Sequence, residues 1–174
     1  MTRARVAAAI AALLTVLVLQ ATLVSPLADA VPASLPALLV AAIALADGPG
    51  AGIAFGFSAG LITDLGSEHP AGLLALCWMG IGLLCGRLNA PNARARHDIV
   101  IAALVCGLST VVTTVLLVLV GADGASVTDA VRYAIPAVLI DGLLALVLVP
   151  LVRLFLHSDR LRAPRPVLVL GEAL

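Results

Sequence analysis

The chain has 174 residues, of which 62% are apolar, 11% charged and 3% aromatic, and its formal net charge is zero. A soluble domain is nearer half apolar and a quarter charged, and a chain of this size has too little interior to hide so much apolar surface from water. The composition therefore excludes an ordinary soluble domain and predicts an all-α integral membrane protein, with lipid as its solvent and no nucleic-acid partner.

The first apolar segment, residues 6–25, carries no charge and follows Arg3 and Arg5. Twenty residues of helix rise about 30 Å, the thickness of a hydrocarbon core. A cleaved signal peptide is the alternative, because Ala28-Asp29-Ala30 has the small-x-small form of a cleavage site. The apolar stretch is longer than the usual signal core of about 7–15 residues, so we favour a membrane anchor.

Two short apolar segments follow, residues 35–46 and 50–64, with Asp47-Gly48-Pro49-Gly50 between them. Proline lacks an N–H and glycine disfavours helix, so this cluster predicts a turn or a break. Each segment is about 20 Å long as a helix, which is short for a full crossing. They form either two short crossings or a re-entrant pair buried in protein, and we favour two crossings.

Three further segments complete the predicted membrane domain, residues 72–86, 99–120 and 134–156. Ser126 with Asp129 three residues later resembles a capping box, which predicts a short interfacial helix before the last segment. About six membrane segments thus make one domain, residues 1–157. We expect residues 158–174, which are basic and then interrupted by proline, to form a disordered cytoplasmic tail.

The arginines predict the orientation in the membrane. With six crossings and both termini in the cytoplasm, nine of the ten arginines are cytoplasmic and Arg132 alone is outside. This is a strong positive-inside distribution. The loop Arg87–Asp98 is then cytoplasmic, where it either meets anionic headgroups or docks a cytoplasmic partner. The nine cytoplasmic arginines are Arg3, Arg5, Arg87, Arg94, Arg96, Arg153, Arg160, Arg162 and Arg165.

Glycine recurs at every fourth position in the third segment, at Gly48, Gly52, Gly56 and Gly60, and Asp64 continues the same row. Residues four apart share one ridge of a helix, and glycine there lets another helix approach closely. We predict that this row binds a partner helix. Asp64 either marks the helix end at the water interface or faces the bundle, where it requires a hydrogen-bond donor.

Asp141 is the second acidic candidate. It lies nine residues after Arg132, about 13 Å further along a helix, which is deep enough to demand a polar partner or a proton. Thr110 and Thr113 of the fifth segment are possible donors in a buried polar site. The acid serves either as a structural tie between helices or as a contact for a ligand or partner.

No catalytic or metal-binding pattern is present in the sequence. It lacks HExxH, GxxxxGK[ST] and GxSxG, and its three cysteines lie in apolar segments without metal-ligand spacing. We therefore expect neither an enzyme nor a bound cofactor or metal.

Residues 19–88 resemble the rod shape-determining protein MreD family. The resemblance rests on Gln20-Ala21-Thr22-Leu23, Pro36, Asp47-Gly48, Gly72-Leu73 and above all the G-F-x-x-G-L-x-x-D stretch from Gly56 to Asp64. The family often has an acid directly after the proline, where this chain has Ala37.

The resemblance implies a non-catalytic inner-membrane component of the bacterial wall-elongation complex, involved in cell shape and peptidoglycan synthesis. The implied partners are an MreC-like membrane protein and wall-synthesis enzymes. The implied fold is that of the substrate-binding subunits of energy-coupling-factor transporters. An alternative function is therefore a substrate-binding subunit of a vitamin-type transporter, with Asp141 or Asp64 at the wall of an outer-facing pocket.

Overall fold

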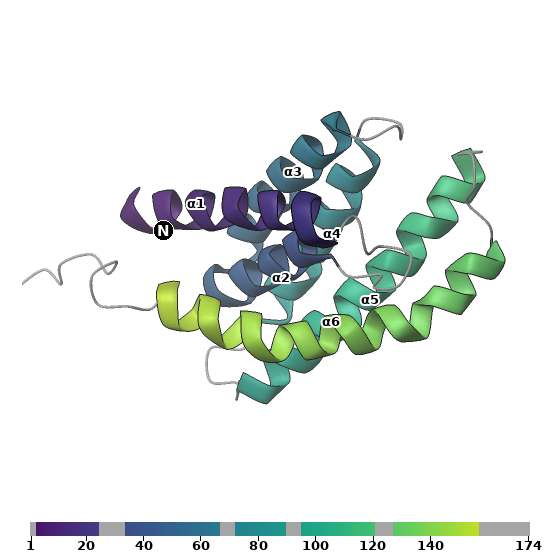
Figure 1. Ribbon diagram of the computed structural model, residues 1–174. Coiled ribbons are helices and arrows are strands. Elements are labelled where there is room, and N and C mark those ends of the chain that lie inside the picture. The colour runs from purple at the N-terminus through teal and green to yellow at the C-terminus, as the bar shows by residue number, and fades with distance from the viewer. Residues whose placement is uncertain (1–2, 25–33, 67–71, 90–94, 121–126, 157–174) are drawn as a thin grey trace, which may run out of the picture.

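The computed structural model describes residues 3–24, 34–66, 72–89, 95–120 and 127–156, and all secondary structure in these ranges is helical (Figure 1). The prediction of an all-α fold is confirmed. The predicted tail, residues 158–174, lies outside the described ranges. The helices are α1 (Arg3–Leu19) with a π-helical turn (Gln20–Val24), α2 (Leu35–Asp47), α3 (Pro49–Leu65), α4 (Leu73–Arg87), α5 (Ala95–Val120) and α6 (Val127–Leu156).

Three of these helices are long and apolar enough to cross a membrane. The candidate span in α1 and its π-helical turn is Arg3–Thr22. The candidate span in α5 is Arg96–Thr113, and that in α6 is Val138–Phe155. Helices α2 and α4 are shorter apolar helices. Large apolar side chains on the long helices are exposed, among them Leu14, Val18, Leu104, Leu119, Leu143 and Leu154. Such a surface suits lipid, which is as apolar as leucine.

Helix α2 forms the centre of the bundle. Every residue from Leu35 to Leu45 is buried, and α2 contacts α1, α3, α4, α5 and α6. Around it, α3 packs beside α4 and α5 packs beside α6 (Figure 1). A helix that is apolar on all sides is the kind that the centre of such a bundle accommodates.

The break between α2 and α3 falls at Gly48, as the sequence predicts. Gly48 has φ +89°, a left-handed conformation that glycine adopts at little cost. Its N–H donates to the Ala44 carbonyl at 2.8 Å and closes the end of α2. Pro49 then begins α3, where the missing N–H of proline is not needed. A single residue thus separates the central helix from the glycine-rich helix.

The prediction of a separate interfacial helix before the last segment is wrong, because α6 is continuous from Val127 to Leu156. Pro136 and Pro150 both lie inside it. A proline removes one hydrogen bond to the fourth residue before it, and for Pro136 that residue is the exposed Arg132. Neighbouring groups and local adjustments can satisfy the freed carbonyl, which is why proline bends rather than ends many membrane helices.

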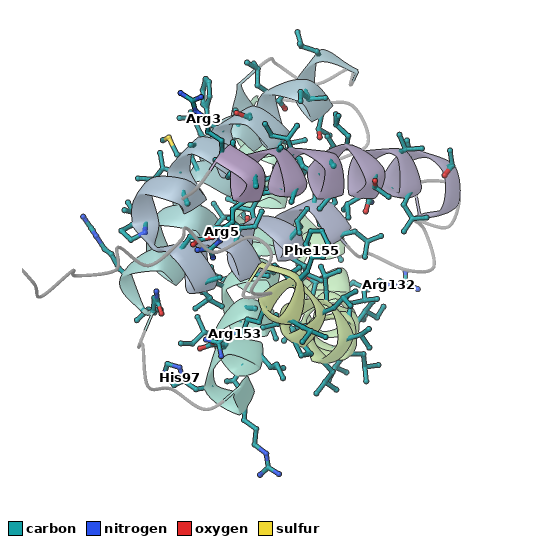
Figure 2. All side chains as sticks on the ribbon, turned by 90° about the vertical axis from the view of Figure 1, so that its left-hand side faces the viewer. Arg3, Arg5, His97, Arg132, Arg153 and Phe155 are labelled. Atoms are coloured by element: carbon teal, nitrogen blue, oxygen red, sulfur yellow. The ribbon has the colours of Figure 1, made fainter. Side chains whose placement is uncertain are left out.

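Two ion pairs tie helices together at one end of the molecule, which we call the basic end. Arg5 of α1 pairs with Asp47 of α2 at 2.7 Å, and Arg153 of α6 pairs with Asp98 of α5. Figure 2 is viewed towards this end and shows Arg3, Arg5, His97 and Arg153 around it. Arg132 lies near the start of α6, at the end of that helix opposite to Arg153. Both pairs connect a helix end to a neighbour, so they fix how the helices meet.

We expect Arg153→Ala to destabilise the protein by about 2 kcal/mol. Asp98 is fully buried, and removing Arg153 leaves this charge without its close cation. The exposed His97, whose Nδ1 lies 3.4 Å from Asp98 Oδ1, and the partly exposed edge of the bundle reduce the cost. Unfolding in mild detergent with increasing SDS measures the change. Arg87→Ala, at an exposed position at the end of α4, is the control and should have no effect. Equal stability of the two variants would contradict a structural role for the pair.

Candidate functional site

The glycine row of α3 packs tightly against α4 of the same chain. A Cβ built on Gly56 would lie 2.7 Å from the Trp78 carbonyl carbon and 2.9 Å from the Met79 nitrogen. Gly52 meets Gly82 in the same way, and Gly60 meets Leu74 and Ala75. Real Cβ atoms essentially never approach backbone so closely. Glycine therefore allows the two helix backbones to touch over most of their length.

This packing uses the face that the sequence assigned to a partner helix. Gly52, Gly56 and Gly60 are all buried, whereas Gly48 sits at the break before α3, where an added Cβ would meet nothing within 4 Å. A partner helix could use the same face only if α4 moved away. The sequence pattern indicates a close helix contact, and the structure places α4 in it.

Asp64 joins the end of α3 to the start of α4. Its carboxylate is buried and accepts backbone N–H bonds from Gly72 at 2.9 Å, Leu74 at 3.1 Å and Ala75 at 3.0 Å. The first N–H groups of a helix have no partner within the helix, and the helix dipole favours an anion beside them. Of the two alternatives for Asp64, the structure shows the second, in which the acid faces the bundle and accepts hydrogen bonds there.

Asp141 is fully buried in α6, and its contact is with the start of α2. The Ser34 backbone N–H donates to Asp141 Oδ1 at 3.4 Å. The second oxygen, Oδ2, has no hydrogen-bond partner in the part of the chain that the structure describes. The hydroxyl of Thr110, a predicted donor, bonds instead to the Cys106 carbonyl at 3.2 Å. Asp141 therefore ties α6 to α2 with one oxygen only.

A small cavity lined by both apolar and hydroxyl-bearing residues includes Ser34 of this contact. Its volume is about 170 Å³, and both predicted threonines, Thr110 and Thr113, line it. Ser34 is a lining residue as well as the hydrogen-bond partner of Asp141, so it connects the carboxylate, which is not itself a lining residue, to the cavity. The other lining residues are Ala37, Leu74, Trp78, Cys106 and Ser109. The two threonines named from the sequence thus line one cavity, and Ser34 connects it to Asp141.

Sequence reasoning missed Ser34, Ser109 and Trp78 as members of this cavity. Ser109 and Thr113 share a face of α5 because they are four residues apart, and that spacing was a usable signal. Nothing in the sequence connects Ser34 with Asp141, which lies 107 residues later.

The loop Arg87–Asp98, considered for a cytoplasmic partner, divides into parts with different environments. Arg87, Arg96 and His97 are exposed, whereas Asp98 is buried against Arg153 and is not available for docking. Residues 90–94, including Arg94, lie outside the described ranges. In those ranges, no group of three or more His, Cys, Asp or Glu residues could hold a metal ion.

Comparison with known families decides the assignment. The model of the family described as rod shape-determining protein MreD matches residues 3–158, nearly the whole chain. The chain belongs to the MreD family. No curated protein and no solved structure matches it. The resemblance seen over residues 19–88 is confirmed, and the match extends through α5 and α6 of this MreD-family protein.

Family membership makes this chain a rod-shape-determining membrane protein, which agrees with its exposed apolar surface and with three described helices that are long and apolar enough to span a membrane. MreD is a family of shape-determining membrane proteins and not a known family of enzymes. The two motif features of the resemblance, the glycine row and Asp64, both act in the α3–α4 hairpin. In this MreD-family chain the motif therefore specifies a packed pair of helices.

Proposed function

We propose that this protein is a non-catalytic component of the bacterial wall-elongation complex, and that it binds a transmembrane helix of an MreC-like partner on the outside of α4 and α5. Wall-synthesis enzymes are further partners in this proposal. The protein lies in the inner membrane with six crossings and both termini in the cytoplasm. The proposal includes a fold like that of the transporter subunits named above. The observation that carries the proposed contact is the environment of Gly80.

Gly80 differs from the other glycines of α4. A Cβ on Gly82 or Gly86 would collide with the backbone of α3 or of the preceding turn, whereas a Cβ on Gly80 would meet nothing within 4 Å. Packing inside the chain therefore does not require glycine at position 80. A glycine on the outside of a membrane helix permits close approach by a helix of another protein.

Gly80 also lines a groove between α4 and α5. The groove has a volume of about 290 Å³, and its walls are Leu76, Cys77, Ile81, Leu84, Val105, Leu108, Ser109, Val112 and Leu116. All of these except Ser109 are apolar, and Ser109 offers a hydroxyl that can hydrogen-bond across a helix interface. A groove lined by one glycine and mostly apolar side chains accepts one face of a membrane helix.

Gly80→Leu should fill the groove without harming the fold. We expect recovery of an MreC-like protein with the variant, from native membranes in mild detergent, to fall roughly tenfold, which corresponds to about 1.4 kcal/mol of binding energy. Mass spectrometry of the co-purified proteins gives the measurement. Thermal unfolding of the isolated variant should match that of the wild type, because the added side chain meets open space.

Ala54→Leu is the matched control, since Ala54 is exposed on α3, away from the groove. It should leave partner recovery unchanged. Undiminished recovery with Gly80→Leu would refute the α4–α5 groove as the contact, whatever the identity of the partner.

Recovery of ATPase subunits in place of wall-elongation proteins would favour the transporter alternative. The family match gives that alternative no support, and Asp64 is engaged in capping α4. We therefore keep the wall-elongation role as the conclusion.

A further inference from the structure

The unsatisfied oxygen of Asp141 is the least explained polar group in the described part of the molecule. The side chain is fully buried, yet only Oδ1 accepts a hydrogen bond, from the Ser34 N–H at 3.4 Å. A carboxylate buried at membrane depth is costly unless it is paired with a cation or bonded to several donors. One long hydrogen bond does not meet that requirement.

Among the residues that the structure describes, no cation forms an ion pair with Asp141. Along the described helices, Arg3, Arg5, Arg87, Arg96 and Arg153 all lie at helix ends that form the basic end, and Arg132 is exposed nine residues before Asp141. Asp141 thus has no counter-charge among the described residues, and a cationic ligand would supply one.

The cavity in front of Ser34 suits a small group of that kind. Four hydroxyl-bearing residues are among those that line it, Ser34, Ser109, Thr110 and Thr113, and hydroxyl oxygens accept hydrogen bonds. The indole of Trp78 forms another part of its wall, and aromatic faces attract cations. A volume of about 170 Å³ holds a group of only a few heavy atoms.

We propose that this cavity binds a cationic hydrogen-bond donor, an alkylammonium or guanidinium group, with Asp141 as its counter-charge. The donor comes from a free amine or from a lysine or arginine side chain of a partner protein. This site shares Ser109 with the α4–α5 groove, but Gly80 does not line it, so the proposal does not depend on the contact at Gly80.

The test uses Trp78, the single tryptophan of the chain, as a reporter. Propylammonium chloride is titrated into the purified protein in neutral detergent, with propanol as the uncharged isostere and sodium chloride to match ionic strength. We expect a saturable change in Trp78 emission with propylammonium and none with propanol. Asp141→Asn should weaken the ammonium response by at least about tenfold, as expected for losing one hydrogen bond to a charged group.

Asp129→Asn is the matched control, because it removes an acid of the same helix that lies twelve residues before Asp141. It should respond like the wild type. Asp141→Asn should also unfold at the same temperature as the wild type or at a higher one, since it removes an uncompensated buried charge. Wild-type affinity for propylammonium in Asp141→Asn would overturn the role of Asp141 as counter-charge.

Further outcomes separate the source of the donor from failure of the proposal. If free propylammonium has no effect, but Asp141→Asn and not Asp129→Asn loses a co-purified membrane protein, the donor is a side chain of that protein. If Asp141→Asn instead unfolds at a markedly lower temperature and neither ammonium nor a partner responds to it, Asp141 is an internal tie and the binding site is refuted.

Discussion

Gly56→Leu should unfold or separate the α3–α4 hairpin, with a loss of about 3 kcal/mol or more. The leucine side chain would have to occupy space now held by the backbone of Trp78 and Met79, and a backbone cannot rotate out of the way as a side chain can. Overpacking in a well-packed interior costs about 1–3 kcal/mol, and a collision with backbone belongs at the upper end of that range. Stability against SDS in mild detergent, together with the amount of protein in the membrane, measures the effect.

The neighbouring helix supplies a matched control for this variant. Gly80→Leu makes the same chemical change on α4, but its Cβ meets nothing within 4 Å, so stability should be unchanged. Gly56→Ala should already be destabilised, because the clash begins at the Cβ atom itself. A Gly56→Leu variant that is as stable as the wild type but has lost its partner would show that the ridge faces another protein, as the sequence pattern first suggested.

The contrast between Gly56 and Gly80 shows what a glycine pattern can predict. A row of glycines at four-residue spacing predicts a close helix contact, and α3 makes one. It does not predict whose helix is in contact, because van der Waals packing of small residues is the same within a chain and between chains. The structure distinguishes the two by showing which glycines would collide with the chain's own backbone and which would not.

The burial of α2 could not be predicted from the sequence, for a related reason. In water, a helix buried on all sides differs from a surface helix by its lack of a polar face. In a membrane, lipid-facing and protein-facing side chains are both apolar, so Leu38 and Leu104 look alike in the sequence. One is fully buried and the other is 58% exposed. The segments and the break at Gly48 were predictable from charge and helix-breaking residues, but the central place of α2 was not.

The sequence predicts that an acid in an apolar segment needs hydrogen-bond donors, but it identifies those donors only in part. An acid in an apolar segment demands donors, and both Asp64 and Asp141 are buried. The donors for Asp64 come from a helix start eight to eleven residues later, close enough in sequence to be anticipated. The donor for Asp141 is a backbone N–H at the start of α2, 107 residues earlier in the chain. Every residue except proline has a backbone N–H, so the residue type at that position does not reveal the contact.

Asp64→Ala should destabilise the protein by about 3 kcal/mol. Three backbone N–H groups at the start of α4 bond to this carboxylate, and at least that of Ala75 is fully enclosed by the bundle. A buried donor left unsatisfied costs about 1–3 kcal/mol, and water reaching Gly72 and Leu74 would reduce the total below the sum of three. The loss should appear as reduced stability against SDS and as faster hydrogen exchange in the first turn of α4.

Asp64→Asn discriminates the structural role from a functional one. Its single carbonyl oxygen can keep the bonds to Gly72 and Ala75, which both use Oδ2 in the wild type, while its amide group confronts the Leu74 N–H. Stability should therefore fall between that of the wild type and that of Asp64→Ala. If Asp64→Asn were as stable as the wild type yet failed to recover the partner, the negative charge itself would be needed for binding, and capping α4 would not be its main role. If stability and partner recovery decline together across the two variants, Asp64 acts by holding α4 against α3, which in turn positions Gly80 and the α4–α5 groove.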